Sequence, residues 1–591
     1  MFGYAGKILF IDLTSRVVRT EPTEKYAADF LGGRGIATKI AYDLIPAEAN
    51  AFDPENALIM MTGPLTSFVP SGSRMDVVAV SPVTGLIGGS STGGEFPSAL
   101  KFAGYDGIVV TGKAEKPVYL RIENGEVSIE SAEGIWGLSA FETIDALTRG
   151  HPDLKVACIG RAGENGVKFA GISFSHRNLA SRGGLGAVMG AKKLKAILVH
   201  GTRGVSPYNP LELMSAFEDI QESITNSGEF LRFKDWHVNF VPTILRLRMP
   251  YFGDYEREWE RAEEAAMKAR KFFEEHTVGR ASCFSCPLRC WGLVEYGGET
   301  LPINLCQGTF PAVTFTLKVE DPELAWRIYR KCQSEGLDMM STVAVVAYAS
   351  RLGKVKLGSE EILDFIERIV KREGEGDVFG EGIKRASEHF GVPAVYVKGG
   401  MESWSSDVRP FVGSALISAV ADSGGVNRAL YGFPEFYYYL KKEQAEELAK
   451  MFVGDVEAAY PWSYSESKVR FAVLWENLHI IADSLGVCVI ALLTTPLKLW
   501  AKAFKAVTGE GITEDELMRT AERIRTLERL FNLKHGNGKD DLSPRLFKGE
   551  VKLDMEKLER MKRLYYSLRG WDENGIPTKE TLEKLGLGDL A

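Results

Sequence analysis

The chain has 591 residues, of which 45% are apolar and 25% charged, and its formal net charge is −8. This length exceeds one compact core and predicts roughly three or four folding units. The composition lacks the basic excess of a nucleic-acid-binding protein, and apolar runs such as VCVIALL are far shorter than the roughly 20 residues of a membrane span. The N-terminal MFGYAGKILFIDLTSR has no secretion signal, so we expect a cytoplasmic protein without nucleic-acid or membrane partners.

Short apolar or alternating runs dominate the first part of the chain: KILFIDL, VVAVS, GIVVTG, KPVYLRI, VACIG and KAILVHG. These runs predict strands. Later the pattern changes to helical periodicity, in EEILDFIERIVKREGEGD, EQAEELAKMFVGD, DELMRTAERIRTLERLFN and DMEKLERMKRLYYSL. The sequence predicts an α+β protein, with a β-rich domain at 1–207 and two mainly α-helical domains at 208–405 and 406–591. The segment GNGKDDLSPRLFKGE, residues 536–550, is interpreted as an exposed loop.

Three stretches of the first domain combine glycine with arginine or hydroxyl side chains: FLGGRGIATK, SGSRMDVVAVSPVTGLIGGSSTGGEF and SRGGLGAVMGAKKLKAI. Glycine allows backbone N–H groups to approach an anion closely, and arginine adds a bidentate phosphate contact. These loops therefore suit a phosphorylated cofactor, although each loop alone is equally typical of a glycine-rich hairpin or bulge.

Three of the seven cysteines lie within CFSCPLRC, residues 283–290. An odd number of cysteines without a secretion signal argues against a disulfide framework. The C-x2-C-x3-C spacing of Cys283, Cys286 and Cys290 suits three corners of a [4Fe-4S] cluster, whose fourth thiolate often comes from a distant segment. Cys488 in ADSLGVCVI is the candidate. A structural zinc site uses similar spacings, and Cys488 as a small buried apolar residue is the simplest alternative.

Together these pieces resemble the tungsten-containing aldehyde:ferredoxin oxidoreductase family over essentially the whole chain. The matching stretches are FLGGRG, PSGSRM, KFAGYDGIVVTG, AGENGVKFA, RGGLGAVMGAKKLKA, CFSCPLRC, GLDMMS, DSLGVC and RGWDENGIPT. The resemblance implies one [4Fe-4S] cluster beside a tungsten or molybdenum atom held by two pyranopterins, with Mg²⁺ bridging the pterin phosphates.

The resemblance also implies roles for particular residues. The cluster ligands are Cys283, Cys286, Cys290 and Cys488, and the carboxylates that hold the two pterins are Asp338 and Asp483. Without the family pattern, Asp338 is interpreted as the N-terminal residue of a helix and Asp483 as a turn residue. The pterin-phosphate region comprises Arg74, Ser91, Gly93, Arg182 and Gly183. Ser91 stands where the family commonly has Asn, and Val487 replaces the more usual leucine before the last cysteine.

The chain departs from the family at two acid/base groups. Aldehyde-oxidising members place a glutamate after the third cluster cysteine and a histidine in the next domain, where this chain has Cys306 and Asn427. A thiolate at Cys306 is a soft ligand for tungsten, as in the branch containing the catalytic subunit of class II benzoyl-CoA reductase. Cys306 as a buried core residue is the alternative. His237, with aromatic neighbours, is a second catalytic candidate, although a lone histidine is more often structural.

Three functions follow from these residues. The first is aldehyde oxidation with electron transfer to ferredoxin or a small iron–sulfur subunit, and the second is reduction of an acyl-CoA with Cys306 on tungsten. The third is a zinc-stabilised binding protein without the cofactor. A homodimer is expected only as a tendency of the family.

Overall fold

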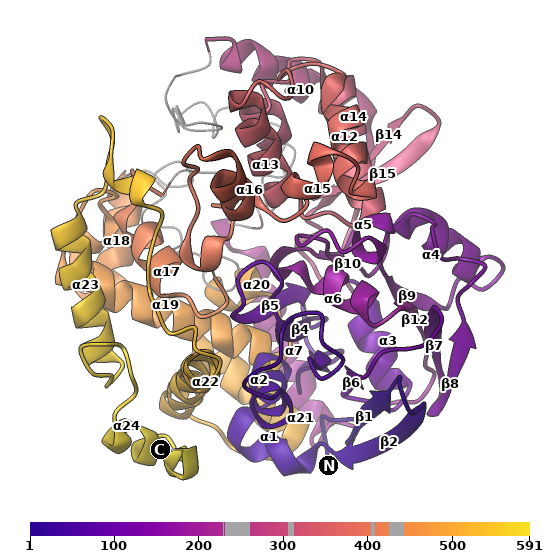
Figure 1. The fold of residues 1–591 in the computed structure, drawn as a ribbon. Coiled ribbons are helices and arrows are strands. Elements are labelled where there is room, and N and C mark those ends of the chain that lie inside the picture. The colour runs from indigo at the N-terminus through magenta and orange to yellow at the C-terminus, as the bar shows by residue number, and fades with distance from the viewer. Residues whose placement is uncertain (229, 231–259, 305–311, 404–407, 425–441, 591) are drawn as a thin grey trace.

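The computed structural model describes the chain except for residues 229, 231–259, 305–311, 404–407, 425–441 and 591. Figure 1 shows the strand-rich N-terminal region at the lower right, the helices of the middle region above it, and the C-terminal helices at the left. The predicted α+β class, with a β-rich first region followed by mainly helical regions, is confirmed.

The N-terminal region contains two six-stranded sheets. The first has the order β2(Val17–Pro22), β1(Lys7–Asp12), β6(Gly107–Thr111), β3(Leu58–Thr62), β4(Met75–Val80) and β5(Ile87–Thr92). The second has the order β11(Leu179–Ala180), β10(Ile172–Ser173), β9(Lys155–Cys158), β12(Leu194–His200), β7(Val118–Glu123) and β8(Glu126–Ser131). The helices of this region are α1(Glu24–Phe30), α2(Gly33–Leu44), α3(Phe96–Phe102), α4(Ala140–Thr148), α5(Arg161–Glu164), η1(Arg182–Gly184) and α6(Leu185–Ala191).

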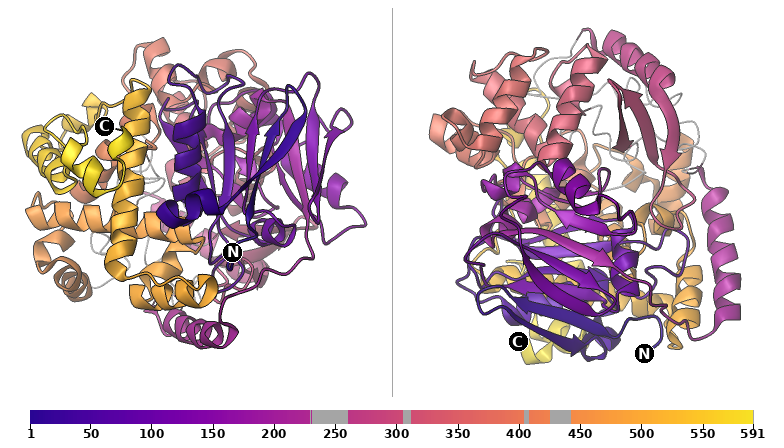
Figure 2. Two further views of the ribbon diagram at one scale, coloured as in Figure 1. Left: turned by 90° about the horizontal axis from the view of Figure 1, so that it is seen from below. Right: turned by 90° about the vertical axis from the view of Figure 1, so that its right-hand side faces the viewer.

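The first sheet is the middle layer of the molecule. In β1, Leu9 and Ile11 pack into a core shared with the second sheet, whereas Ile8 and Phe10 point the other way and pack against the C-terminal helices. Successive side chains of a strand point to opposite faces, so a strand buried on both sides is apolar at every position. The left view of Figure 2 shows the strands beside the orange and yellow C-terminal helices.

The middle region combines a small antiparallel sheet with helices. Its strands are β13(Thr277–Ala281), β14(Trp291–Tyr296) and β15(Glu299–Asn304). Its helices are α10(Ala262–His276), η2(Ala312–Thr316), α12(Pro322–Glu335), α13(Met339–Arg351), α14(Glu361–Lys371), α15(Glu375–Phe379), α16(Ile383–Phe390) and η3(Lys398–Gly400). These elements share a hydrophobic core around Trp326, Tyr329 and Phe365.

The C-terminal region is helical. It contains α17(Val412–Val420), α18(Lys442–Val453), η5(Val456–Ala459), α19(Glu466–Leu485), α20(Val489–Leu493), α21(Leu497–Thr508), α22(Glu514–Lys534), η6(Pro544–Phe547), α23(Met555–Leu568), α24(Lys579–Lys584) and η7(Gly588–Leu590). The earlier helix α7(Pro210–Thr225) packs against α21, beside which it lies in Figure 2. The predicted boundaries after residues 207 and 405 stay predictions.

The predicted strands and helices named above are present, but the interpretation of residues 536–550 as an exposed loop is partly wrong. Leu546 in η6 is fully buried, and Asp540 is 7% exposed. The Asp540 carboxylate accepts hydrogen bonds from Arg529 and Tyr566, so burial of this polar segment is stabilised by paired charges. Among the described helices, none is long and apolar enough to cross a membrane.

Candidate functional site

Cys283, Cys286 and Cys290 lie half-buried in the loop between β13 and β14. The loop is attached to the first sheet by backbone hydrogen bonds: the N–H of Phe284 donates to Gly94 O at 3.1 Å, and the N–H of Ser71 donates to Ser285 O at 3.0 Å. The spacing therefore brings three thiols to the edge of the first domain, where PSGSRM and the glycines after β5 meet them.

Cys488 lies at the start of α20 and joins the same place from the other side. Its N–H donates to Ser71 O at 3.0 Å, and Ser71 Oγ is 3.1 Å from Cys286 Sγ. Ser71 thus connects the local cysteine loop to the distant cysteine. Burial and, as a smaller cause, the proximity of Cys488 raise the pKa of the Cys286 thiol to about 12. Because burial and neighbouring thiols disfavour the thiolate form of these cysteines, a bound metal cation would stabilise that form.

The end of α19 is held by unusually close backbone contacts with FLGGRG. A Cβ on Gly33 would lie 1.9 Å from Asp483 O, and a Cβ on Gly32 would lie 2.9 Å from Ser484 O. These two glycines therefore permit close packing against α19. Asp483 lies in the last turn of this helix, and Val487 behind it is fully buried.

Arg74 lies between the thiols and Asp483. Burial disfavours its charge, but the neighbouring thiols of Cys488 and Cys283 and the carboxylate of Asp483 outweigh burial and raise the pKa of the guanidinium. Its Nη2 donates to Ser91 O at 3.3 Å. A Cβ on Gly93 would lie 2.7 Å from Cys283 Sγ and 3.1 Å from Arg74 Nη1, so only glycine leaves room for both groups.

A second buried arginine, Arg34 of the FLGGRG stretch, also faces Asp483. Its Nη1 lies 3.5 Å from Asp483 Oδ2, and its Nε and Nη2 each donate to the Glu528 carboxylate at 2.8 Å. This bidentate pair joins α2 to α22 and fixes the guanidinium next to Asp483.

Asp338 is the N-cap of α13, as the helix-start interpretation expected. Its carboxylate accepts hydrogen bonds from the N–H groups of Met340 and Ser341, and its Oδ2 lies 3.8 Å from Arg182 Nε. Arg182 also donates from Nη2 to Glu402 O at 2.6 Å. The next residue, Gly183, has φ of 85°, in the left-handed region that favours glycine.

Several buried polar atoms near these residues have no hydrogen-bond partner among the described residues. They are Arg74 Nε, Ser91 Oγ, Thr92 Oγ1, Arg182 Nε and Arg182 Nη1. Unpaired buried donors are costly, and two arginines with free donors suit the phosphates of an anionic cofactor. The donor set therefore fits the phosphorylated pterins expected from the sequence.

Three residues expected at this site, Cys306, His237 and Asn427, lie outside the described part of the chain. Cys158 and Cys332 are fully buried core residues, and burial raises the pKa of each thiol to about 12. Within the described ranges, no three His, Cys, Asp or Glu side chains are arranged to hold a single metal ion, and the zinc alternative stays a prediction.

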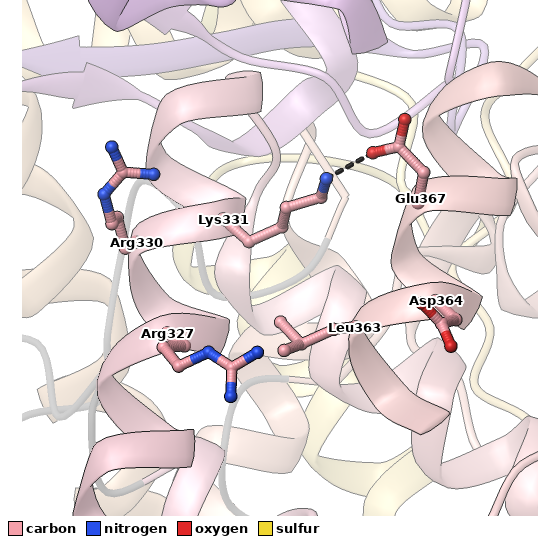
Figure 3. A pocket seen from close by; sticks show the side chains of 6 residues that line it. All are labelled: Arg327, Arg330, Lys331, Leu363, Asp364 and Glu367. Atoms are coloured by element: carbon pink, nitrogen blue, oxygen red, sulfur yellow. Dashed lines mark hydrogen bonds and ion pairs between the residues drawn. The ribbon is translucent and has the colours of Figure 1, made fainter. Parts of the chain in front are cut away.

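A cavity of about 310 Å³ between α12 and α14 lies away from these residues (Figure 3). Its basic side chains Arg327 and Lys331 are paired with Glu360 and Glu367, respectively. None of the cysteines and aspartates described above lines this cavity.

Comparison with known proteins identifies the class of this site. Residues 8–201 match the family described as "Aldehyde ferredoxin oxidoreductase, N-terminal domain", and residues 242–587 match "Aldehyde ferredoxin oxidoreductase, domains 2 & 3". The chain is an oxidoreductase that belongs to the aldehyde ferredoxin oxidoreductase family.

Individual relatives cover the whole chain. The "Tungsten-containing aldehyde ferredoxin oxidoreductase" of Pyrococcus furiosus is 32% identical, with 100% of both chains covered. The "Aliphatic sulfonate oxidoreductase, WOR-like subunit" of the same organism is 28% identical and covers 100% of this chain and 98% of its own. The solved structure described as "Active site complex BamBC of Benzoyl Coenzyme A reductase in complex with 1,5 Dienoyl-CoA" has a TM-score of 0.84, with 26% identity and coverage of 100% of this chain and 98% of that chain.

Four residues of this site were missed by sequence reasoning: Ser71, Arg34, Ser341 and Glu402. Ser71 and Arg34 lie within quoted motifs, so the motifs themselves were the available signal. Ser341 lies in GLDMMS, three residues after Asp338, at the spacing of side chains that meet on one helix face. Nothing local marks Glu402, because its partners come from distant segments.

Proposed function

We propose that this chain is a tungsten or molybdenum bis-pyranopterin iron–sulfur oxidoreductase. In this proposal it oxidises aldehydes to carboxylic acids and passes electrons to ferredoxin or a small iron–sulfur subunit. The observation that carries the proposal is the position of Arg74, whose charge faces Cys283, Cys488 and Asp483 at once. A positive charge that faces both the cysteines and Asp483 suits the boundary between a thiolate-bound cluster and an anionic pterin.

The chain's own residues have distinct tasks in this proposal. Cys283, Cys286, Cys290 and Cys488 hold the [4Fe-4S] cluster. Asp338 and Asp483 would accept hydrogen bonds from the two pterins. The polar atoms of Arg74, Ser91, Gly93, Arg182 and Gly183 would hold the phosphates and Mg²⁺, and Val487 is buried just after the end of α19. The free donors of Arg74 and Arg182 support this placement.

The cofactors supply redox chemistry that side chains lack: a two-electron centre beside a one-electron cluster. In aldehyde oxidation, the aldehyde C–H bond breaks, a C–O bond to a water oxygen forms, and two electrons and two protons are released. The electrons leave through the cysteine loop, which reaches the surface. Phe284 is 40% exposed, and Ser285 and Arg289 beside it are also exposed. A ferredoxin or small iron–sulfur subunit can approach the cluster at this loop.

Reduction of an acyl-CoA is the second candidate function. It is supported by the benzoyl-CoA reductase complex among the similar structures and by Cys306 at or beside the position of the family's glutamate. In this variant of the proposal the Cys306 thiolate is a protein ligand of tungsten, which an aldehyde-oxidising enzyme of this family does not need.

Metal analysis of anaerobically purified protein, with X-ray absorption at the tungsten edge, tests the proposals. About four iron atoms and one tungsten with about four sulfur neighbours support aldehyde oxidation. A further sulfur that is lost in Cys306→Ala and retained in the core control Cys332→Ala supports the acyl-CoA function. Turnover of aldehydes against aromatic thioesters provides a second readout. Zinc without iron or tungsten refutes both enzyme functions, and light scattering tests the expected homodimer.

A further inference from the structure

Glu402 is a fully buried carboxyl group beside the proposed pterin site. It has 0% exposure and follows η3, in a short bridge with Tyr396. Its main-chain oxygen accepts the hydrogen bond from Arg182, and its Oε1 accepts one from the N–H of Ile383 at 2.9 Å. Its other oxygen, Oε2, lies 2.8 Å from Ser341 Oγ. Glu402 thus lies next to Arg182 and Asp338 of the proposed pterin site, and no role has been assigned to its side chain above.

The Ser341 hydroxyl lies between two carboxyl groups. Its Oγ is 2.6 Å from Asp338 Oδ2 and 2.8 Å from Glu402 Oε2. A hydroxyl has one proton and can donate to only one of them. The second contact is a hydrogen bond only if the other carboxyl is protonated and donates to Ser341. With both contacts at hydrogen-bond distance, one of the two carboxyl groups is therefore protonated.

The surroundings indicate which carboxyl carries this proton. Asp338 accepts two backbone N–H groups at the start of α13 and faces the Arg182 side chain, so its oxygens already act as acceptors of donated hydrogens. Glu402 is buried without an ion pair among the described residues. Burial raises the pKa of Glu402, and its backbone contacts, Ser341 and Arg182 only partly oppose this effect. Within the described part of the chain, the charged groups facing Glu402 are Arg182 and, through Ser341, Asp338.

We propose that Glu402 is a neutral carboxylic acid that exchanges its proton with Asp338 through Ser341. In the exchange, the Glu402 Oε2–H bond breaks, Ser341 gains this proton and passes its own to Asp338 Oδ2, and the serine is unchanged. Negative charge arriving near Asp338 favours the proton on Asp338, and removal of that charge returns it to Glu402. This inference rests on the proposed function, which places Asp338 against a pterin.

This relay gives the chain a proton-handling group at a site whose usual acid/base residues are replaced. From the sequence, Cys306 is expected at or beside the position of the family's glutamate and Asn427 in place of its histidine. Glu402 and Ser341 are positioning residues in this scheme, because they act through Asp338 and do not touch substrate.

Infrared difference spectroscopy tests the proton on Glu402 directly. At neutral pH, we expect a protonated-carboxyl stretching band that shifts in deuterium oxide, is absent in Glu402→Gln and changes frequency in Ser341→Ala. Glu335→Gln, which removes a buried carboxyl paired with Arg161, is the matched control and leaves the band unchanged. In the metal-loaded enzyme, the Glu402 band weakens on chemical reduction while a protonated-carboxyl band of Asp338 appears at another frequency, and reoxidation reverses both changes.

The outcomes separate this inference from the proposed function. A band that survives Glu402→Gln, or no such band in the wild type, overturns the proton assignment. A band that does not respond to reduction in metal-loaded protein overturns the relay. The resting band does not depend on metal, so protein that lacks tungsten and iron refutes the proposed function while the proton on Glu402 is still measured. With loaded enzyme, we expect Glu402→Gln and Ser341→Ala to lower kcat roughly a hundredfold at unchanged metal content.

Discussion

Replacing Arg34 with Met removes a buried charge while keeping a side chain of similar reach. The Arg34 guanidinium donates two hydrogen bonds of 2.8 Å to Glu528, and the two side chains are only 6% and 2% exposed. The substitution leaves the Glu528 carboxylate in the interior without this partner, and it also removes a cation from Asp483. We therefore expect Arg34→Met to destabilise the contact between α2 and α22.

The magnitude follows from the burial of the pair. Removing one partner of a buried ion pair costs about 3–5 kcal/mol, because the remaining charge is desolvated and unpaired. Glu528 retains an attraction to Arg525, so the lower end, about 3 kcal/mol, is expected. Replacing both members of the pair with apolar residues also removes the buried Glu528 charge that Arg34→Met leaves behind. Arg34→Met/Glu528→Met should therefore be less destabilised than Arg34→Met alone.

Hydrogen exchange of peptides from α22 measures this local effect, which suits a chain too large for two-state unfolding. A loss of about 3 kcal/mol corresponds to roughly hundredfold faster exchange of the protected amides. Peptides from the second sheet, which does not contact Arg34, provide the internal reference. Unchanged protection of α22 in Arg34→Met, or lower protection in the double variant than in the single one, would refute this account of the pair.

Three further changes test other parts of the structure. Gly93→Ala places a Cβ 2.7 Å from Cys283 Sγ and should lower the iron content at least by half. Gly134→Ala is the control, because nothing lies within 4 Å of its Cβ, and it should keep the wild-type iron content. Equal iron contents in the two variants would contradict the crowding argument. Although partial burial opposes ionisation, hydrogen bonds from basic neighbours hold the pKa of Glu367 at about 2, below an unfolded value of about 4.3. The stabilisation from the Glu367 carboxylate is thus complete above about pH 5. In thermal scans, the difference in melting temperature between wild type and Glu367→Gln should shrink as pH falls from about 4 to about 2. A difference that stays constant over this range would contradict the prediction. Phe284→Ala should slow ferredoxin-linked turnover about tenfold and leave reduction of a small dye unchanged, and an equal loss with the dye would argue against docking at this residue.

The fold was predictable where one local pattern decides the structure. The alternation in KILFIDL predicts β1, and the structure adds only that both faces are buried, Leu9 toward the second sheet and Phe10 toward the helices. The segment 536–550 was not predictable in this way. Its polar composition is that of an exposed loop, but Arg529 and Lys398 bind Asp540 in the interior, and neither partner can be inferred from the segment itself.

The same distinction between local patterns and long-range contacts applies to the candidate site. The spacing of Cys283, Cys286 and Cys290 brings three thiols together locally, and sequence alone suffices for that prediction. The approach of Cys488 depends on Ser71, which binds both cysteine segments through its backbone and hydroxyl. Such long-range contacts leave no periodic signal, so the sequence offered Cys488 only as a candidate from its segment ADSLGVCVI, and the resemblance to the family implied the same residue.

The two aspartates of the proposed pterin site have different electrostatic surroundings, and this difference bears on how charge moves through the protein. Asp483 faces the cations of Arg34 and Arg74. Asp338 faces one cation, Arg182, and is joined through a hydroxyl to a second carboxyl group. Ser341 and Glu402 therefore give a proton that compensates added negative charge a place to rest beside Asp338. Asp483 lies five residues before Cys488, so this proposed proton path is on a different segment of the chain from the fourth cysteine.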